Sequence, residues 1–209
     1  MNLEKSLKNY FEELASNSPT PGGGNVSALC GALSASLGAM VCGLTIGKKK
    51  YAEVEAEMID LKGKLESAQG EFFVLGQKDN SAFDLVMDAF KLPKETEDEK
   101  AARNKKIEEA TIGAGKVPAS VIAKCAEILP YIKTVVEKGN KNSLSDAGVA
   151  AKLIASAAYG AYLNVLINCS SYKGNAEAAQ LLESSEDLLN KINRDTNEIN
   201  ESVVKELKG

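Results

Sequence analysis

Hydrophobic residues recur at three- and four-residue spacings along most of the chain, the period of helices that bury one face. Residues 2–16 show this pattern first, and a longer charged segment at residues 53–90 repeats it. The alternating pattern of a half-buried strand is not found in any segment. The pattern therefore predicts an all-α protein.

Helix boundaries are marked by capping and breaking residues. Thr96–Glu99 has the form of a capping box and predicts a helix that runs to about Gly115. Pro118 then predicts a new helix, because proline fits best in a first turn, and this helix should end at Gly139. Ser143–Asp146 has the form of a second capping box.

Two helices are predicted to be almost free of charge. Residues 25–47 contain no charged side chain, and small residues recur there at every fourth position, which lets another backbone approach closely. Residues 147–169 form an alanine-rich companion. Both are long enough to cross a membrane, but glycine and serine dilute the first, and Lys152 and Asn164 interrupt the second. We therefore expect two buried central helices and no membrane span.

The last segment repeats apolar residues at nearly heptad spacing from Leu181 to Leu207, which suits a long bundle or dimer helix. Long helices joined by short loops most economically form an antiparallel bundle. With 209 residues, of which 44% are hydrophobic, the chain can bury one sizeable core. The sequence thus predicts a single helical domain over residues 1–209.

The amino-acid composition excludes several classes of function. The 25 basic and 29 acidic residues leave no basic surplus for nucleic acid. Histidine is absent, which rules out a Ser-His-Asp triad and the usual imidazole zinc site, so proton transfer must use Asp, Glu, Lys, Tyr or Cys. The four cysteines are widely spaced and predict buried, reduced thiols. The charged start of the chain lacks a signal-peptide core, so we expect a cytoplasmic protein.

A proline–glycine loop precedes the first uncharged helix. Its free amides and the positive helix end suit a carboxylate or a carbonyl oxygen, whereas a turn that merely lets the chain enter a crowded bundle explains the composition equally well. It is not a phosphate loop, because the glycines are not followed by a GK[ST] sequence. The candidate binding residues here are Pro21, Gly22, Gly23 and Gly24.

Charged and amide side chains supply the remaining candidates. Three consecutive lysines follow the uncharged helix and suit a polyanionic tail, although lysines commonly end helices. Asp79 lies among apolar residues, as either a functional carboxylate or a helix cap, and Asp146 lies at a predicted helix start. Four asparagines could line a polar pocket or cross-link helices. The lysines and asparagines are Lys48, Lys49, Lys50, Asn140, Asn142, Asn164 and Asn168.

Together these segments resemble the cyclodeaminase domain of formiminotransferase-cyclodeaminase and the related free-standing methenyltetrahydrofolate cyclohydrolases of bacteria. No single motif is decisive, but their order and spacing extend over nearly the whole chain. They are Pro19–Gly24, Leu44–Tyr51, Asp79 with Val86–Ala89, Leu92–Lys94, Val117–Pro118, Gly139–Asn140, Ser145–Asp146 and Asn164–Asn168.

The resemblance implies a helical homodimer that binds a tetrahydrofolate derivative, with a mono- or polyglutamate tail, near the subunit interface, without a metal or a separate cofactor. Because the bridging carbon carries positive charge, we expect Asp79 or Asp146 to stabilise it and carry protons. The asparagines would orient the pterin, and the lysines and the glycine loop, helped by Arg103, would hold the glutamate tail. A tyrosine common in the family is Phe83 here, which leaves any role for that hydroxyl open.

Three functions remain in competition. The first is conversion of 5-formiminotetrahydrofolate to 5,10-methenyltetrahydrofolate and ammonia. The second is hydrolysis of the methenyl compound to 10-formyltetrahydrofolate, and no residue separates it from the first. The third is a non-catalytic helical interaction module, which would explain the heptads and alanine-rich helices without chemistry.

Overall fold

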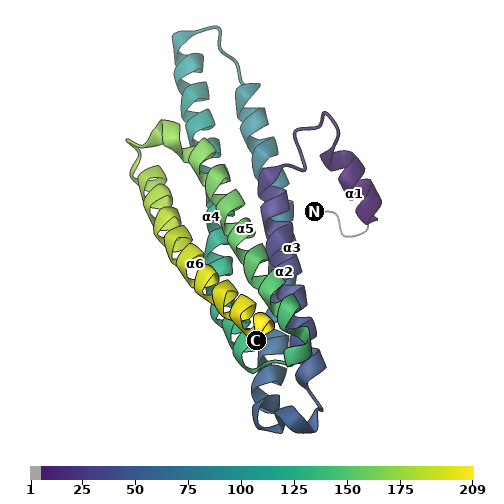
Figure 1. Cartoon of the computed structure of the whole chain (residues 1–209). Helices are drawn as coiled ribbons and strands as arrows, with labels where there is room; N and C mark the ends of the chain where they lie inside the picture. The colour runs from purple at the N-terminus through teal and green to yellow at the C-terminus, as the bar shows by residue number, and fades with distance from the viewer. Residues whose placement is uncertain (1–5) are drawn as a thin grey trace.

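The computed structural model describes residues 6–209, which form an antiparallel bundle of long helices without a strand in that range (Figure 1). The predicted all-α bundle is therefore confirmed. Three short 3₁₀ turns, η1, η2 and η3, join successive helices. In chain order the elements are α1 Leu7–Leu14, α2 Gly23–Thr45, η1 Lys49–Val54, α3 Glu55–Phe90, α4 Glu97–Lys138, η2 Lys141–Ser143, α5 Leu144–Cys169, η3 Ser170–Tyr172 and α6 Ala176–Lys208.

Helix α2 contacts α3, α4 and α5, and its small residues set how closely they approach. The ring of Phe72 on α3 occupies the space where Gly31 lacks a side chain. Leu65 and Ile132 fill the equivalent space at Gly38. Of these two glycines only Gly31 belongs to the predicted every-fourth stripe, and Gly43 and Gly47 at the end of the stripe have little or nothing packed against them. Close approach is therefore confirmed at Gly31, where a large side chain rather than another backbone lies against α2.

Helices α3 and α4 form the longest hairpin, and its tip extends beyond the other helices at the top of Figure 1. The predicted capping box at its turn is confirmed, because the Thr96 hydroxyl accepts from the N–H of Glu99 and the Glu99 carboxylate accepts from the N–H of Thr96. Arg103 also donates to the carbonyl of Phe90 across the turn. The hairpin is thus closed by polar contacts at its tip.

Several predicted boundaries are wrong. The break between Gly115 and Pro118 does not exist, since α4 runs unbroken past Pro118 and Pro130. Proline removes one helical hydrogen bond, but the Pro118 ring is buried in the bundle, so tertiary packing outweighs the local preference. The predicted box at Ser143 is also absent, because Ser143 makes no side-chain cap. In the first helix, residues 2–5 lie outside the described part of the chain.

The core is one connected cluster to which α2 through α6 contribute. All four cysteines are unpaired; Cys42, Cys125 and Cys169 are buried, as predicted, whereas Cys30 is half-buried. By length and composition, α2 and the segment Lys141–Tyr172 could each cross a membrane. Core helices of bundles satisfy the same criterion, and both segments pack against other helices here.

The close contact between α2 and α3 can be tested by comparing two glycines. Alanine at Gly31 would overlap the Phe72 ring, and such overpacking costs about 1–3 kcal/mol. Gly70 has open space around its Cβ direction within α3, so Gly70→Ala should instead raise the free energy of unfolding by about 0.5–1 kcal/mol. Urea unfolding of both variants measures the difference, and equal effects would contradict the packing described.

Candidate functional site

The proline–glycine loop leads into helix α2, whose N-cap residue provides no side-chain cap. Helix α2 begins at Gly23, and Gly22 at the N-cap has no side chain to satisfy the first amides of the helix. The turn before it is tight, with a cis Thr20–Pro21 peptide bond and a hydrogen bond from the Ser18 hydroxyl to the carbonyl of Thr20. Free N–H groups at a helix start attract negative charge or carbonyl oxygen.

Asp79 of α3 lies against this helix start. A side chain at Gly24 would overlap its carboxyl group, so glycine is what allows the carboxyl to come so close to the first turn of α2. The main-chain N–H of Asn25 interacts with the same carboxyl. Asp79 is half-buried and therefore both shielded from solvent and reachable.

The surroundings of Asp79 make its ionised form less favourable than it would be in water. Burial raises the pKa of this carboxyl, and the N–H of Asn25 acts in the opposite direction without cancelling the rise. A carboxyl with a raised pKa is better suited to exchange protons near neutral pH than an exposed one. Asp79 is thus the carboxyl in this part of the molecule best suited to acid–base work.

An asparagine of α5 also lies close to this helix start. The position of a Cβ on Gly23 would be 3.4 Å from Nδ2 of Asn164. Asn164 donates to the carbonyl of Gly160, and Asn168 donates to the carbonyl of Asn164. The amide oxygens of both residues are thus available. The structure therefore brings the glycine loop, Asp79 and Asn164 together, with Asn168 one turn farther along.

The second group of predicted residues lies at the opposite end of the bundle. Asn140 links segments there, because its N–H donates to the hydroxyl of Thr45, its side chain donates to the carbonyl of Leu44, and its side-chain oxygen accepts from the N–H of Asn142. Since α2 separates the two ends, they are about 33 Å apart in one chain. Asn140 and Asn142 thus do not share a site with Asp79 within a single copy.

The lysine run belongs to the same far end. Lys48, Lys49 and Lys50 are exposed, and the Lys50 ammonium lies 5.5 Å from the centre of the Tyr51 ring. The Tyr51 hydroxyl accepts from the N–H of Lys141, which ties the run to the α4–α5 connection. Asp146 is half-buried in the first turn of α5 near these residues.

Arg103 joins neither group. It donates to the carbonyl of Phe90 and lies 5.5 Å from the centre of the Phe90 ring, at the tip of the α3–α4 hairpin. Phe90 is eleven residues beyond Asp79 on α3, which places the two about 16 Å apart. In one copy, Arg103 thus acts as a tie across the hairpin.

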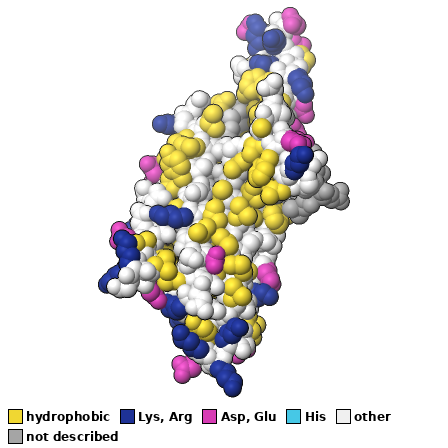
Figure 2. All heavy atoms as spheres, turned by 45° about the vertical axis from the view of Figure 1, so that its right-hand side comes forward, with side chains coloured by type: hydrophobic (Ala, Val, Ile, Leu, Met, Phe, Trp, Pro, Cys, Tyr) yellow, Lys and Arg dark blue, Asp and Glu magenta, His cyan; other side chains and the backbone are white. Residues whose placement is uncertain are grey.

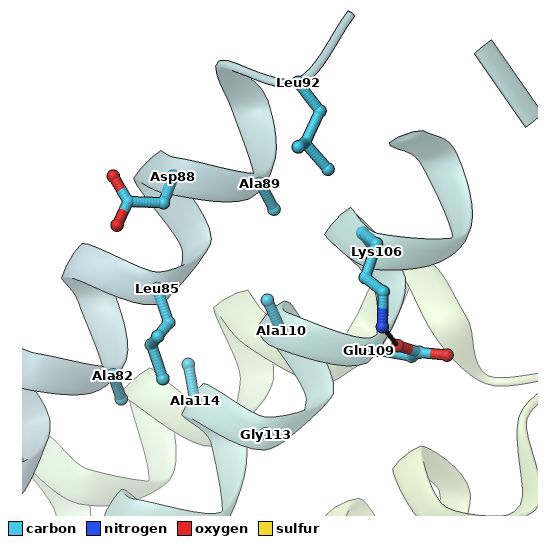
Figure 3. A pocket seen from close by; sticks show the side chains of 10 residues that line it. All are labelled: Ala82, Leu85, Asp88, Ala89, Leu92, Lys106, Glu109, Ala110, Gly113 and Ala114. Atoms are coloured by element: carbon cyan, nitrogen blue, oxygen red, sulfur yellow. Dashed lines mark hydrogen bonds and ion pairs between the residues drawn. The ribbon is translucent and has the colours of Figure 1, made fainter. Parts of the chain in front are cut away.

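A groove of about 530 Å³ lies between α3 and α4 below that tip. Figure 3 shows Leu85 and Leu92 directed into it and the Lys106–Glu109 ion pair at its edge. Alanine and glycine form most of its remaining wall, so the groove exists because the facing side chains are small. Polar groups do not converge in it as catalysis would require, and Asp79 does not line it.

Sequence reasoning missed two side chains of the Asp79 region. Tyr10 donates to the side-chain oxygen of Asn25 at 2.9 Å, and the Asn25 amide donates to the carbonyl of Gly76 and to the side-chain oxygen of Asn80. In the sequence, Tyr10 is one of the apolar positions in the amphipathic pattern of residues 2–16, which gives no sign of a polar role. Asn25, directly after three glycines and at the start of an uncharged helix, was the available signal for a buried polar group.

Comparison with known proteins shows where this arrangement belongs. Residues 6–187 match the model of the family described as formiminotransferase-cyclodeaminase. Methenyltetrahydrofolate cyclohydrolase of Methylorubrum extorquens is 43% identical over 88% of this chain and 89% of its own. Formimidoyltransferase-cyclodeaminase of Sus scrofa is 33% identical over 90% of this chain, which corresponds to only 35% of that protein.

A solved structure agrees over almost the full length. The formiminotetrahydrofolate cyclodeaminase of Thermotoga maritima has a TM-score of 0.81 and 32% identity, and the match covers 96% of this chain and 98% of that one. Fold, motif order and sequence identity thus agree, and the chain belongs to the formiminotransferase-cyclodeaminase family.

Proposed function

We propose that this protein is an enzyme of tetrahydrofolate one-carbon metabolism that opens or closes the methenyl bridge between N5 and N10. The observation that carries the proposal is the half-buried Asp79 carboxyl, with its raised pKa, against the first turn of α2. Relatives with enzyme names cover most of the chain, which favours catalysis over the interaction module.

Of the two reactions, hydrolysis of 5,10-methenyltetrahydrofolate to 10-formyltetrahydrofolate is the first candidate. The 43% identity to a cyclohydrolase extends over nearly the whole of both chains and supports it. Cyclodeamination of 5-formiminotetrahydrofolate stays the second candidate, because the Thermotoga maritima cyclodeaminase matches over 98% of its length at 32% identity. Both reactions pass through a tetrahedral carbon and need one proton carrier.

In hydrolysis, water adds to the cationic bridge carbon while the Asp79 carboxylate takes one of its protons. The neutral adduct then loses its bond between the carbon and N5. Asp79 returns a proton to N5, and the proton of the adduct's hydroxyl leaves to solvent, which gives the 10-formyl product and one net proton. Before water adds, the carboxylate also stabilises the positive charge of the methenyl group.

In cyclodeamination, N10 adds to the protonated formimino carbon and Asp79 accepts the proton of N10. The same proton passes to the amino group, ammonia leaves, and the methenyl cation forms. Asn164 and Asn168 would orient the pterin beside Asp79 with their available amide oxygens. The chemistry needs neither a metal nor a cofactor other than the folate.

The exposed lysines would bind the glutamate tail, and a longer polyglutamate chain would give them more carboxylates to pair with. In one chain, however, they are about 33 Å from the helix start beside Asp79. A homodimer resolves this separation. If two copies pack with their α2 helices antiparallel, the Asp79 end of each copy lies beside the end of its partner that carries the lysines, Asn140 and Asp146.

An uncovered apolar seam on α2 supports this dimer. Hydrophobic side chains that are exposed or half-buried follow one another at alternating spacings of four and three, the pattern of a helix that packs along a second helix. Figure 2 shows hydrophobic side chains gathered in a band down the face that it presents. The seam consists of Val26, Cys30, Leu33, Leu37, Met40 and Leu44, and on α5 Val149, Tyr159, Leu163 and Ile167 are also exposed.

A second copy is the occupant that fits the seam. Two identical uncharged seams can cover each other across a two-fold axis without burying an unpaired charge. With this face covered, the protein would be a soluble dimer, for which we propose a cytoplasmic location. Its fold resembles that of the Thermotoga maritima cyclodeaminase over nearly the whole of both chains.

The proposed reaction is tested by giving the purified protein both folates. We expect loss of methenyl absorbance well above the chemical background, with a kcat/KM at least tenfold higher than for formation of the methenyl compound from 5-formiminotetrahydrofolate. The reverse preference would make the protein a cyclodeaminase. Turnover of neither folate would sink the proposed function and favour the interaction module.

The role of Asp79 is tested by Asp79→Asn, with Asp84→Asn on the exposed side of α3 as the matched control. Loss of a proton carrier typically lowers kcat about 10²- to 10⁴-fold. Since burial raises the pKa of this acid, its ionised form destabilises the folded state at pH values above the unfolded pKa, so neutral asparagine should not lower the melting temperature at pH 7. Near wild-type rates in the folded Asp79→Asn variant would reject the assignment.

The dimer is tested at the middle of the seam. Leu33 is 47% exposed, and Leu33→Glu would bury like charges opposite each other, so sedimentation should show a monomer where the wild type is a dimer. Val74→Glu is the control, because Val74 is equally exposed at 47% but lies on α3. A monomeric, fully active wild type would contradict the shared site, and binding of the wild type to lipid vesicles would point to a membrane instead.

A further inference from the structure

Helix α1 is anchored to the bundle by one buried side chain. Tyr10 is the buried residue of this helix and is 6% exposed, whereas Leu7 and Phe11 are 63% and 53% exposed. Its hydroxyl donates to the side-chain oxygen of Asn25 at 2.9 Å. Burial raises the pKa of the phenol, and Cys30 and Asp79 add to the rise, so the hydroxyl keeps its proton as a donor around neutral pH.

Asn25 connects this phenol to the part of α3 that carries Asp79. The residue is fully buried, and its amide nitrogen donates to the carbonyl of Gly76 at 2.7 Å and to the side-chain oxygen of Asn80 at 3.2 Å. Its main-chain N–H interacts with the Asp79 carboxyl. Gly76 and Asn80 lie within one helical turn of Asp79, so Asn25 ties the first turn of α2 to the turn of α3 that presents the carboxyl.

We propose that Tyr10 and Asn25 are positioning residues, which hold the Asp79 carboxyl in a fixed place at the start of α2. This inference rests on the proposed function. The phenol determines which way the Asn25 amide faces. Because the Tyr10 hydroxyl donates a hydrogen bond, the amide oxygen must face Tyr10. The amide nitrogen then faces the carbonyl of Gly76 and the side-chain oxygen of Asn80, to which it donates. Without the phenol, a buried acceptor loses its partner and the amide loses the group that orients it.

Tyr10→Phe tests the inference, because it removes one hydroxyl and keeps the ring. Tyr172→Phe is the matched control, since Tyr172 is half-buried in η3 and takes no part in the hydrogen bonds that join Tyr10, Asn25 and α3. For the folate that the wild type converts, we expect kcat of Tyr10→Phe to fall about 3- to 10-fold, the effect of one neutral hydrogen bond, with KM changed less than twofold. An unchanged kcat, or an equal loss in Tyr172→Phe, would overturn the inference.

A double variant separates positioning from general weakening of the fold. If Tyr10 acts through Asp79, adding Tyr10→Phe to Asp79→Asn should lower the residual kcat by less than twofold. If Tyr10 only supports the structure, Tyr10→Phe should lower kcat by the same factor in the wild type and in Asp79→Asn. This outcome would reject the inference. Failure of the proposed function is recognised separately, because the wild type would then convert neither folate.

Discussion

Both the core and the candidate site depend on the close contact between α2 and α3. Along the middle of α2, the missing side chains of Gly31 and Gly38 admit Phe72 and Leu65, so the two helices pack backbone to side chain. At the start of α2 the same contact continues, but there Gly24 admits a carboxyl instead of a hydrocarbon. The site is thus one more layer of the packing, in which an acid takes the place that a hydrophobic side chain occupies elsewhere.

Sequence periodicity predicted the fold well because the helices are long and strongly patterned. The uncharged α2, the capping box at Thr96 and the spacing of small residues each reflect local physics that survives in the folded state. Pro118 misled the prediction because its effect depends on what surrounds it. A proline in an isolated helix breaks it, whereas here the neighbouring helices bury the ring and the segment stays helical, and that information is not local.

The site was harder to predict for the same reason. Asp79 and the glycine loop could be chosen from composition, and the structure places them in contact. Asn140 and Asp146 lie at the other end of the bundle because of the direction in which α5 runs relative to α2. The hydrophobic pattern of each helix alone does not predict that direction. Asn25 and Tyr10 were missed because their roles depend on a hydrogen bond between segments that the sequence analysis treated as separate.

The uncharged character of α2 has a consequence for biosynthesis. Ser34 of α2 donates to the carbonyl of Ala150, a partner that is synthesised 116 residues later. During translation, α2 therefore leaves the ribosome as an apolar helix before α5, one of the helices that cover it, has been synthesised. Exposed apolar segments of this kind promote aggregation of incomplete chains. A chain built around such a helix depends on rapid synthesis or on chaperones that shield nascent polypeptides until α5 has been made.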